Sequence, residues 1–147
     1  ETALGLALVS QSWSFFLDVW PRGDAIEIPI HPVTTLDAIR LHLTDGTIQT
    51  VPAGIFELDA LRRPARILRR RGAVLPSVDL RRANGIEFSL GLGFGASGSA
   101  VPAPIRQALL MLIAHWFENR EPVTTDAPAL LPIAISELLH PWRPVRL

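Results

Sequence analysis

Cysteine and lysine are both absent from this chain of 147 residues. Without cysteine, the fold cannot depend on disulfide bonds or on metal sites built from thiolates. All fourteen basic side chains are arginines, and they balance fourteen acidic ones, so the formal net charge is zero. A neutral chain exerts no bulk electrostatic attraction on nucleic acid. The longest uninterrupted apolar run, 108–114, is far too short to cross a bilayer.

Apolar residues dominate what the chain does contain. Hydrophobic residues make up 48% of the sequence and charged residues only 19%. This balance excludes a disordered protein, and the length is sufficient for one domain with a real core. So little charge also indicates that partners cover part of the apolar surface.

Alternating apolar and polar residues predict a series of short strands before residue 95. The predicted strands are 11–20, 25–30, 36–43, 47–51, 55–58, 65–68 and 85–94. Asp45-Gly46 between two alternating runs predicts a hairpin with a type I′ turn, and Pro29 predicts that its strand lies at a sheet edge. Because no helical pattern separates these strands, they favour an antiparallel sandwich or barrel over a parallel α/β sheet.

A helix is predicted from Ile105 to Glu121, where apolar residues recur at helical spacing and Pro122 stops the pattern. The residues expected in the protomer core are Leu109, Leu112, Ile113 and Trp116. Truncation of Trp116 to alanine should then cost roughly 3–5 kcal/mol. Glu118 and Arg120 are expected to form ion pairs at the helix end or between subunits.

Two sequence features invite a functional interpretation that their context does not support. Gly93, Gly95 and Gly98 fit the spacing of a dinucleotide-binding loop, but 101–104 separates them from the helix and no βαβ unit follows, so a linker is predicted. The triplet Arg22-Gly23-Asp24 resembles an adhesion motif and is better explained as a turn.

The search for catalytic and metal-binding groups yields no site. The four histidines are His31, His42, His115 and His140. None has a second ligand at a metal-binding helical spacing. His115 is the strongest candidate, next to Trp116 on the central helix, and a structural role is favoured for it. Serines lack a nucleophile-elbow context. We therefore predict no enzyme, no metal and no cofactor.

The last third of the chain resembles a known family. The stretch VPAPIRQALLMLIAHWFENREP, followed by LPIAISELLHPWRPVRL, resembles the head–tail connector (adaptor, or head-completion) family of tailed phages and phage-like gene transfer agents. In that family, a Val-Pro start and Arg-Gln-Ala lead into a helix with an Ala-His-Trp-aromatic-Glu-Asn-Arg-Glu sequence. A Leu-Pro segment, a small helix and a Pro-aromatic-Arg tail follow. The matching residues are Val101, Pro102, Arg106–Ala108, Ala114–Glu121, Leu131, Pro132, Leu138, Leu139, Pro141–Arg143, Arg146 and Leu147.

The resemblance implies an α+β fold in which a helical connector core carries an inserted antiparallel β-sandwich or barrel-like module and an extended C-terminal tail. In this division, 1–10 is the end of an N-terminal helix whose start lies upstream of Glu1. Residues 11–95 form the β module, and 96–122 the linker and central core helix. Residues 123–147 form a short helix and a partner-binding tail.

The resemblance also implies a structural virion protein. Adaptors of this family form a dodecameric ring beneath the portal protein, extend the DNA channel, and join the capsid to the stopper or tail. DNA would pass through the ring without sequence-specific binding, and the protein would be assembled in the host cytoplasm, with no membrane and no cofactor. The tail is expected to leave the domain and dock on the portal through Leu139, Pro141, Trp142, Arg143, Val145, Arg146 and Leu147. The helix expected in the core or between subunits contributes Arg106, Leu109, Leu112, Ile113, Trp116, Glu118 and Arg120.

Eight arginines lie between Arg62 and Arg82, and only Asp79 opposes them in that stretch. The residues expected on a loop that faces DNA or a neighbouring subunit are Arg62, Arg63, Arg69, Arg70 and Arg71. Solvent or a neighbouring protein is favoured over DNA, because a channel through which DNA slides gains little from tight binding.

The alternative function, from another class of protein, is that of a small β-sandwich that binds a ligand or carbohydrate through exposed aromatics. Its candidate aromatics are Trp13, Trp20 and Phe56.

Overall fold

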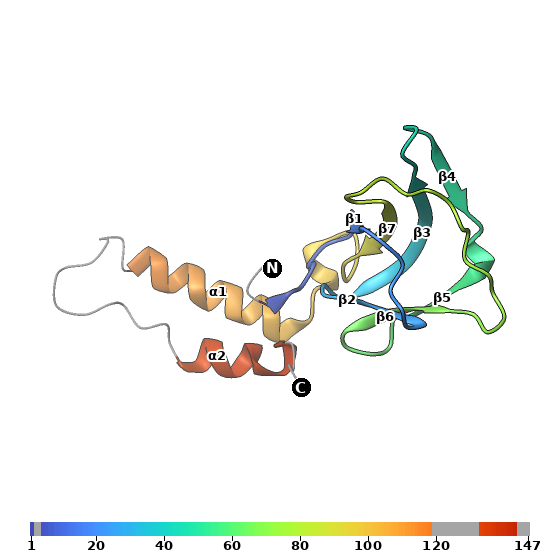
Figure 1. The fold of residues 1–147 in the computed structure, drawn as a ribbon. Helices are drawn as coiled ribbons and strands as arrows, with labels where there is room; N and C mark the ends of the chain where they lie inside the picture. Colours follow the sequence, from blue (N-terminus) through green and yellow to red (C-terminus); the bar gives the residue numbers. More distant parts are fainter. Residues whose placement is uncertain (2–3, 119–132, 144–147) are drawn as a thin grey trace.

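The computed structural model describes residues 1, 4–118 and 133–143. Its strands form a β body, residues 11–92, from which two helices project side by side as a helical arm, residues 103–118 and 133–142 (Figure 1). The N-terminal segment lies where the arm meets the β body.

Two antiparallel sheets make up the β body. The four-stranded sheet has the order β1-β7-β3-β4, and the three-stranded sheet has the order β2-β6-β5. The first sheet contains β1 (Gln11–Leu17), β7 (Ile86–Leu92), β3 (Val33–His42) and β4 (Ile48–Val51). The second contains β2 (Ala25–Ile28), β6 (Ala65–Arg69) and β5 (Phe56–Asp59). Strands were predicted in all seven places, and β2 lies at a sheet edge as expected.

The main hydrophobic core lies in the β body. Strand β7 shows why, because every second side chain from Ile86 to Leu92 is buried while the residues between them are half-buried on the outer face. Phe88 is fully buried, and its ring contacts those of Phe15, Trp20 and Phe56 at centroid distances of 6.2–6.4 Å. The predicted alternation in this strand is therefore confirmed.

The hairpin between β3 and β4 forms at Asp45-Gly46, but the predicted type I′ turn is wrong. Of Asp45 and Gly46, only Gly46 has a positive φ, at 85°. A type I′ turn needs a positive φ at both central residues. The Asp45 carboxylate instead accepts hydrogen bonds from the backbone N–H and the hydroxyl of Thr47, at 2.8 and 2.7 Å. This side-chain bond holds Asp45 in an ordinary conformation and leaves the left-handed position to glycine.

Residues 6–10 are extended, whereas the resemblance implies that 1–10 is the end of an N-terminal helix. Leu6–Ser10 contains no helical residue, and Leu6 forms a parallel bridge with His31, flanked by hydrogen bonds of 2.9 Å from Ala7 N to His31 O and from His31 N to Gly5 O. The linker after β7 then passes close to this segment. Gly93 has a φ of 107°, and a Cβ added there would lie 2.3 Å from the carbonyl oxygen of Val9. Close packing and backbone conformation therefore both require glycine at this position of the linker.

The arm consists of α1 (Ala103–Glu118), α2 (Ile133–Leu139) and a final 3-10 turn, η4 (His140–Trp142). The buried residues of α1 are Ile105 and Ala108, so the two helices enclose only a small second cluster. The predicted helical connector core is wrong: the sheets form the main core, and the helices extend from it. Two helices packed on one side cannot surround a core of their own. No described helix is long and apolar enough to cross a membrane.

Candidate assembly surface

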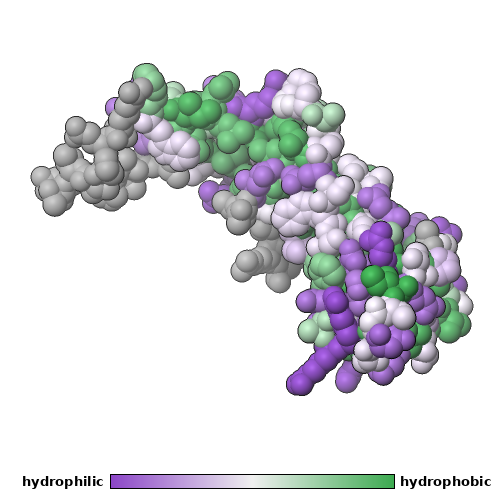
Figure 2. All heavy atoms as spheres, turned by 90° about the horizontal axis from the view of Figure 1, so that it is seen from above, coloured by the Kyte–Doolittle hydropathy of each residue, from purple (hydrophilic) through white to green (hydrophobic). Residues whose placement is uncertain are grey.

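One face of α1 carries large apolar side chains that its own protomer leaves exposed. We call this surface the open face. The exposed fractions are Leu109 41%, Leu110 61%, Ile113 59%, Trp116 62% and Phe117 66%. Figure 2 shows hydrophobic side chains gathered along the arm. The prediction that Leu109, Ile113 and Trp116 are buried in the protomer core is wrong, and Leu112 is half-buried.

The geometry of the helix explains the error. Ile105, Ala108 and Leu112 lie on one side of α1, and both Ile105 and Leu112 line a groove shared with α2. Leu109, Ile113 and Trp116 follow at spacings of three and four residues on the adjacent side. The apolar stripe is therefore wider than one neighbouring helix can cover. Periodicity identified the stripe but not the number of elements around it.

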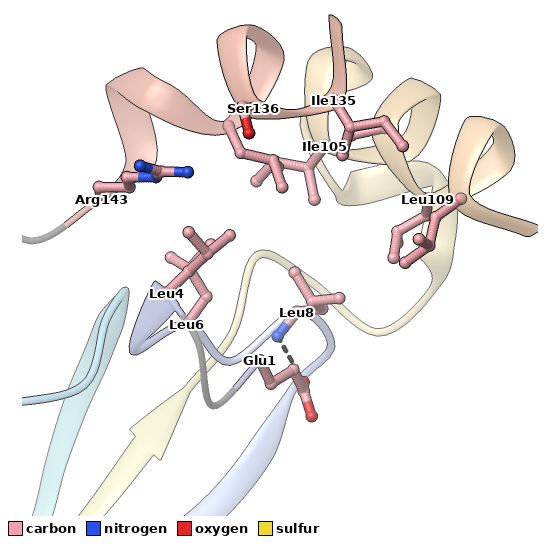
Figure 3. A pocket seen from close by; sticks show the side chains of 12 residues that line it. Glu1, Leu4, Leu6, Leu8, Ile105, Leu109, Ile135, Ser136 and Arg143 are labelled. Atoms are coloured by element: carbon pink, nitrogen blue, oxygen red, sulfur yellow. Dashed lines mark hydrogen bonds between the residues drawn. The ribbon is translucent and has the colours of Figure 1, made fainter. Parts of the chain in front are cut away.

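The groove beside the open face lies between the N-terminal segment, α1 and α2 (Figure 3). Its volume is about 550 Å³, and its walls include Leu4, Leu8, Leu109 and Ile135. Polar groups lie at its margin. Among them, Glu1 accepts a hydrogen bond of 2.8 Å from the backbone N–H of Leu8. A groove lined in this way offers shape and apolar area to a partner, with little hydrogen-bonding specificity.

Trp142, the predicted portal anchor, packs on its own protomer. Its ring meets that of Phe94 edge to face at 5.6 Å, and the guanidinium carbon of Arg63 lies 4.9 Å from its centroid. Leu139 also packs in this cluster, whereas Pro141 and Arg143 are exposed. The prediction that the tail leaves the domain from Pro141 is therefore wrong for Trp142. Val145, Arg146 and Leu147 lie outside the described residues.

A buried histidine lies next to this junction. His31 is 8% exposed, and its Nε2 atom has no hydrogen-bond partner among the described residues. Burial lowers the pKa of His31, and the positive charge of Arg63 lowers it further. A neutral imidazole is the form that this position favours.

The outer face of the four-stranded sheet carries a polar cluster centred on Glu87. Its carboxylate accepts hydrogen bonds from Ser14 Oγ at 2.8 Å and from Arg40 at 3.4 Å, and pairs with His42 Nε2 at 2.9 Å. The bond with His42 contributes most to a lowered pKa of Glu87, and the bond from Ser14 lowers it further. The alternation within the predicted strand 36–43 places Arg40 and His42 on its polar side. It could not predict their partner, because that requires knowing that β7 lies between β1 and β3.

No family model and no curated protein matches the chain, whereas solved structures do. A chain in the virion of a native gene transfer agent particle is 32% identical, with a TM-score of 0.79, and the alignment covers 99% of this chain and 71% of that one. A chain from the neck of an empty particle, computed with C6 symmetry, is 32% identical with a TM-score of 0.80 over the same shares. A chain from the neck of a native particle, computed with C12 symmetry, is 33% identical with a TM-score of 0.79, covering 99% and 76%.

The chain belongs to this family of gene transfer agent particle proteins. The resemblance found in the sequence is thereby confirmed at the level of the particle, as is localisation in the virion. A structural role follows for the gene transfer agent protein described here. The narrower role of an adaptor beneath the portal goes beyond these similarities.

The arginines of this gene transfer agent protein do not form the single loop that was predicted. Arg66 pairs with Asp59 at 2.7 Å, and Arg69 pairs with Asp24, so the Arg22-Gly23-Asp24 turn is occupied within the protomer. Strand β6 separates the remaining members. Arg62 and Arg63 precede it, whereas Arg70 and Arg71 follow it, about 16 Å further along at the usual rise per residue. Arg70 donates to the carbonyl oxygen of Phe56 at 3.5 Å. The remaining arginines therefore lie in two groups, one at each end of β6, and do not form one basic patch.

The aromatics of the alternative ligand-binding function do not form a binding surface. Trp20 stacks on Phe56 at 5.6 Å inside the core, and Phe56 is only 5% exposed. Trp13 alone of the three is exposed, and its indole N–H donates to Gln11 Oε1 at 2.8 Å. Within the described residues, no three potential metal ligands come together, and His140 is exposed.

Proposed function

We propose that this protein is an adaptor-type connector of a gene transfer agent neck. In this role, copies form a ring beneath the portal protein, extend the channel through which DNA passes, and join the capsid to the stopper or tail. The open face of α1 carries the proposal, because it exposes more large apolar side chains than a monomeric protein needs. Similar chains in particle necks with C6 and C12 symmetry support it.

The open face would contact a neighbouring copy. In a closed ring, each copy presents two different surfaces, one to each neighbour. Leu109, Ile113 and Trp116 supply the apolar centre of one such surface, and Arg106 and Glu118 are exposed toward the two ends of the helix. Burial of such a surface is the main favourable contribution in most protein associations. Arg120, also assigned to this contact, lies outside the described residues.

The tail would then reach the portal from a fixed point. With Trp142 held between Phe94 and Arg63, we propose that Val145, Arg146 and Leu147 contact the portal, and that Leu139, Pro141 and Arg143 set the direction of the tail. Repetition around a ring multiplies a modest affinity per tail. DNA would pass with little direct binding, because the net charge is zero and the arginines are divided between the two ends of strand β6.

The experiment places a charge on the open face. Ile113→Glu should leave the thermal unfolding of the isolated protomer unchanged, because the side chain is 59% exposed. It should abolish ring formation with the portal, seen by negative-stain microscopy, and incorporation into particles. Gln107→Glu is the matched control: it adds the same charge on the exposed polar side of α1 and should assemble normally. Normal occupancy of Ile113→Glu in particle necks would contradict the proposal.

A truncation tests the tail separately. Removal of residues 144–147 should leave a folded protomer that still forms rings but no longer attaches to heads that carry the portal. Attachment of the truncated protein at parental occupancy would remove the tail from the proposal without affecting the ring.

A further inference from the structure

The four-stranded sheet ends in two open edges. Strands β1 and β4 are its outermost members, and among the described residues β1 pairs with β7 alone and β4 with β3 alone. Both edge strands carry exposed apolar side chains. Trp13 and Phe16 on β1 are 47% and 39% exposed, and Ile48 on β4 is 58% exposed.

Neither edge has the protection that soluble proteins usually give to an edge strand. Charged residues and proline commonly block strand addition there, yet β1 (QSWSFFL) and β4 (IQTV) contain neither. The three-stranded sheet of the same body provides the comparison. Its edge strand β2 contains Glu27, and its other edge strand β5 contains Glu57 and Asp59. One sheet is therefore protected against pairing, and the other is open at both ends.

The strand directions make the two open edges complementary. All neighbours in the sheet are antiparallel, and the number of strands is even, so β1 and β4 run in opposite directions. A copy placed beside the sheet continues the alternation when its β4 lies against β1. Cyclic assembly needs such a pair of different, matching surfaces on every copy, and the C12 symmetry of the neck that contains a similar chain is cyclic.

We propose that β1 of one protomer pairs in antiparallel fashion with β4 of the next copy in the ring, so that the four-stranded sheets join across subunits. The partner is a second copy of this chain, and the inference rests on the proposed ring. Pairing satisfies backbone groups at both edges and removes no charge from water, since neither strand carries one. Phe16 and Ile48 lie on the same outer face of the sheet. Phe16 lies opposite Glu87, which in turn lies opposite the outward-facing Arg40. Ile48 lies opposite His42, which faces outward as well. Pairing of β1 with β4 of the next copy therefore places the outer-face side chains of both strands, including Phe16 and Ile48, on the same side of the joined sheet.

Cysteine cross-linking tests the contact directly, because the parent chain has no cysteine. We would introduce Ser14→Cys on β1 and Thr50→Cys on β4, both on the outer face, and treat assembled particles with a short bis-maleimide. Within one protomer, the two strands are about 14 Å apart, three times the usual strand spacing. Opposite or diagonal positions on paired strands lie within about 8 Å. The double variant should give a ladder of covalent multimers, whereas either single variant should remain monomeric.

The control pair combines Ser14→Cys with Glu57→Cys, which is exposed on β5 and outside the proposed contact. Rings that form in particle necks without a ladder would overturn the strand pairing and leave the proposed function standing. Dimers from either single variant would overturn it as well, because they indicate that identical edges meet. Absence of the parent protein from necks would overturn both proposals.

A second variant covers the case in which the double cysteine variant does not assemble. Thr50→Glu adds a charge to the exposed edge of β4 and should leave the melting temperature of the protomer unchanged while preventing incorporation. Ser77→Glu, on an exposed loop of the β body, should incorporate normally. Incorporation of Thr50→Glu at the parental level would overturn the pairing.

Discussion

The β body and the helical arm are built from the same kinds of apolar residue and bury them to very different extents. Phe88 at the centre of the β body is fully buried, whereas Trp116 on α1 is 62% exposed. The body has two sheets, so each strand finds a second layer opposite it. Helix α1 has α2 on one side only. Burial of an apolar side chain therefore depends on how many layers surround it, and we infer that assembly supplies the missing layer of the arm.

The largest effect is expected in the β body. Phe88→Ala removes a ring that three other aromatic rings contact, and should lower the free energy of unfolding by about 3–5 kcal/mol. Chemical denaturation of the isolated protein measures this. Phe16→Ala, on the exposed face of the same sheet, is the control and should cost far less. A loss below about 1 kcal/mol for Phe88→Ala would contradict the division between body and arm.

The next effect depends on pH. The hydrogen bonds that lower the pKa of Glu87 stabilise the folded protein at pH values above the ordinary pKa of 4.5, and this contribution is lost as the pH falls through the lowered, folded-state value. Glu87→Gln should therefore cost about 1.5–3 kcal/mol at neutral pH. The difference between parent and variant should shrink on acidification. Denaturation curves from neutral pH to about pH 3 test this, and a difference that does not change would contradict it.

The sequence predicted the strands of the body well, because alternation is a local signal and a buried face repeats every second residue, as in β7. It also predicted α1 and the short helix before Trp142. It could not predict which surfaces meet. The pairing of Glu87 with His42 depends on strand order. The exposure of Ile113 depends on how many other elements pack around α1, which the sequence of α1 does not reveal. The same limit explains the error over Trp142, whose partners Phe94 and Arg63 are distant in the sequence.

A smaller effect is expected at the junction between the body and the arm. Arg63→Ala removes the guanidinium above Trp142 and should cost about 0.5–1 kcal/mol, the usual value of an exposed cation–π contact. Near-ultraviolet circular dichroism, which reports on the tryptophan environment, should change with it. The neighbouring Arg62→Ala is the matched control, and equal changes in both variants would show that Arg63 has no special contact.

The smallest effect on the isolated protomer is expected for Trp116→Ala, the substitution for which the sequence predicted a large one. Its side chain is mostly exposed, and alanine has a better helix propensity than tryptophan, so the free energy of unfolding should change by no more than about 0.5 kcal/mol. Ile105→Ala, on the buried side of the same helix, should cost about 2–5 kcal/mol. Assembly should respond differently: Trp116→Ala, which hardly changes the stability of the protomer, should strongly lower neck occupancy, because occupancy depends on the open face. If Trp116→Ala destabilised the protomer but assembled normally, the open face would be covered within the protomer itself. The arm would then be an ordinary part of the protomer core.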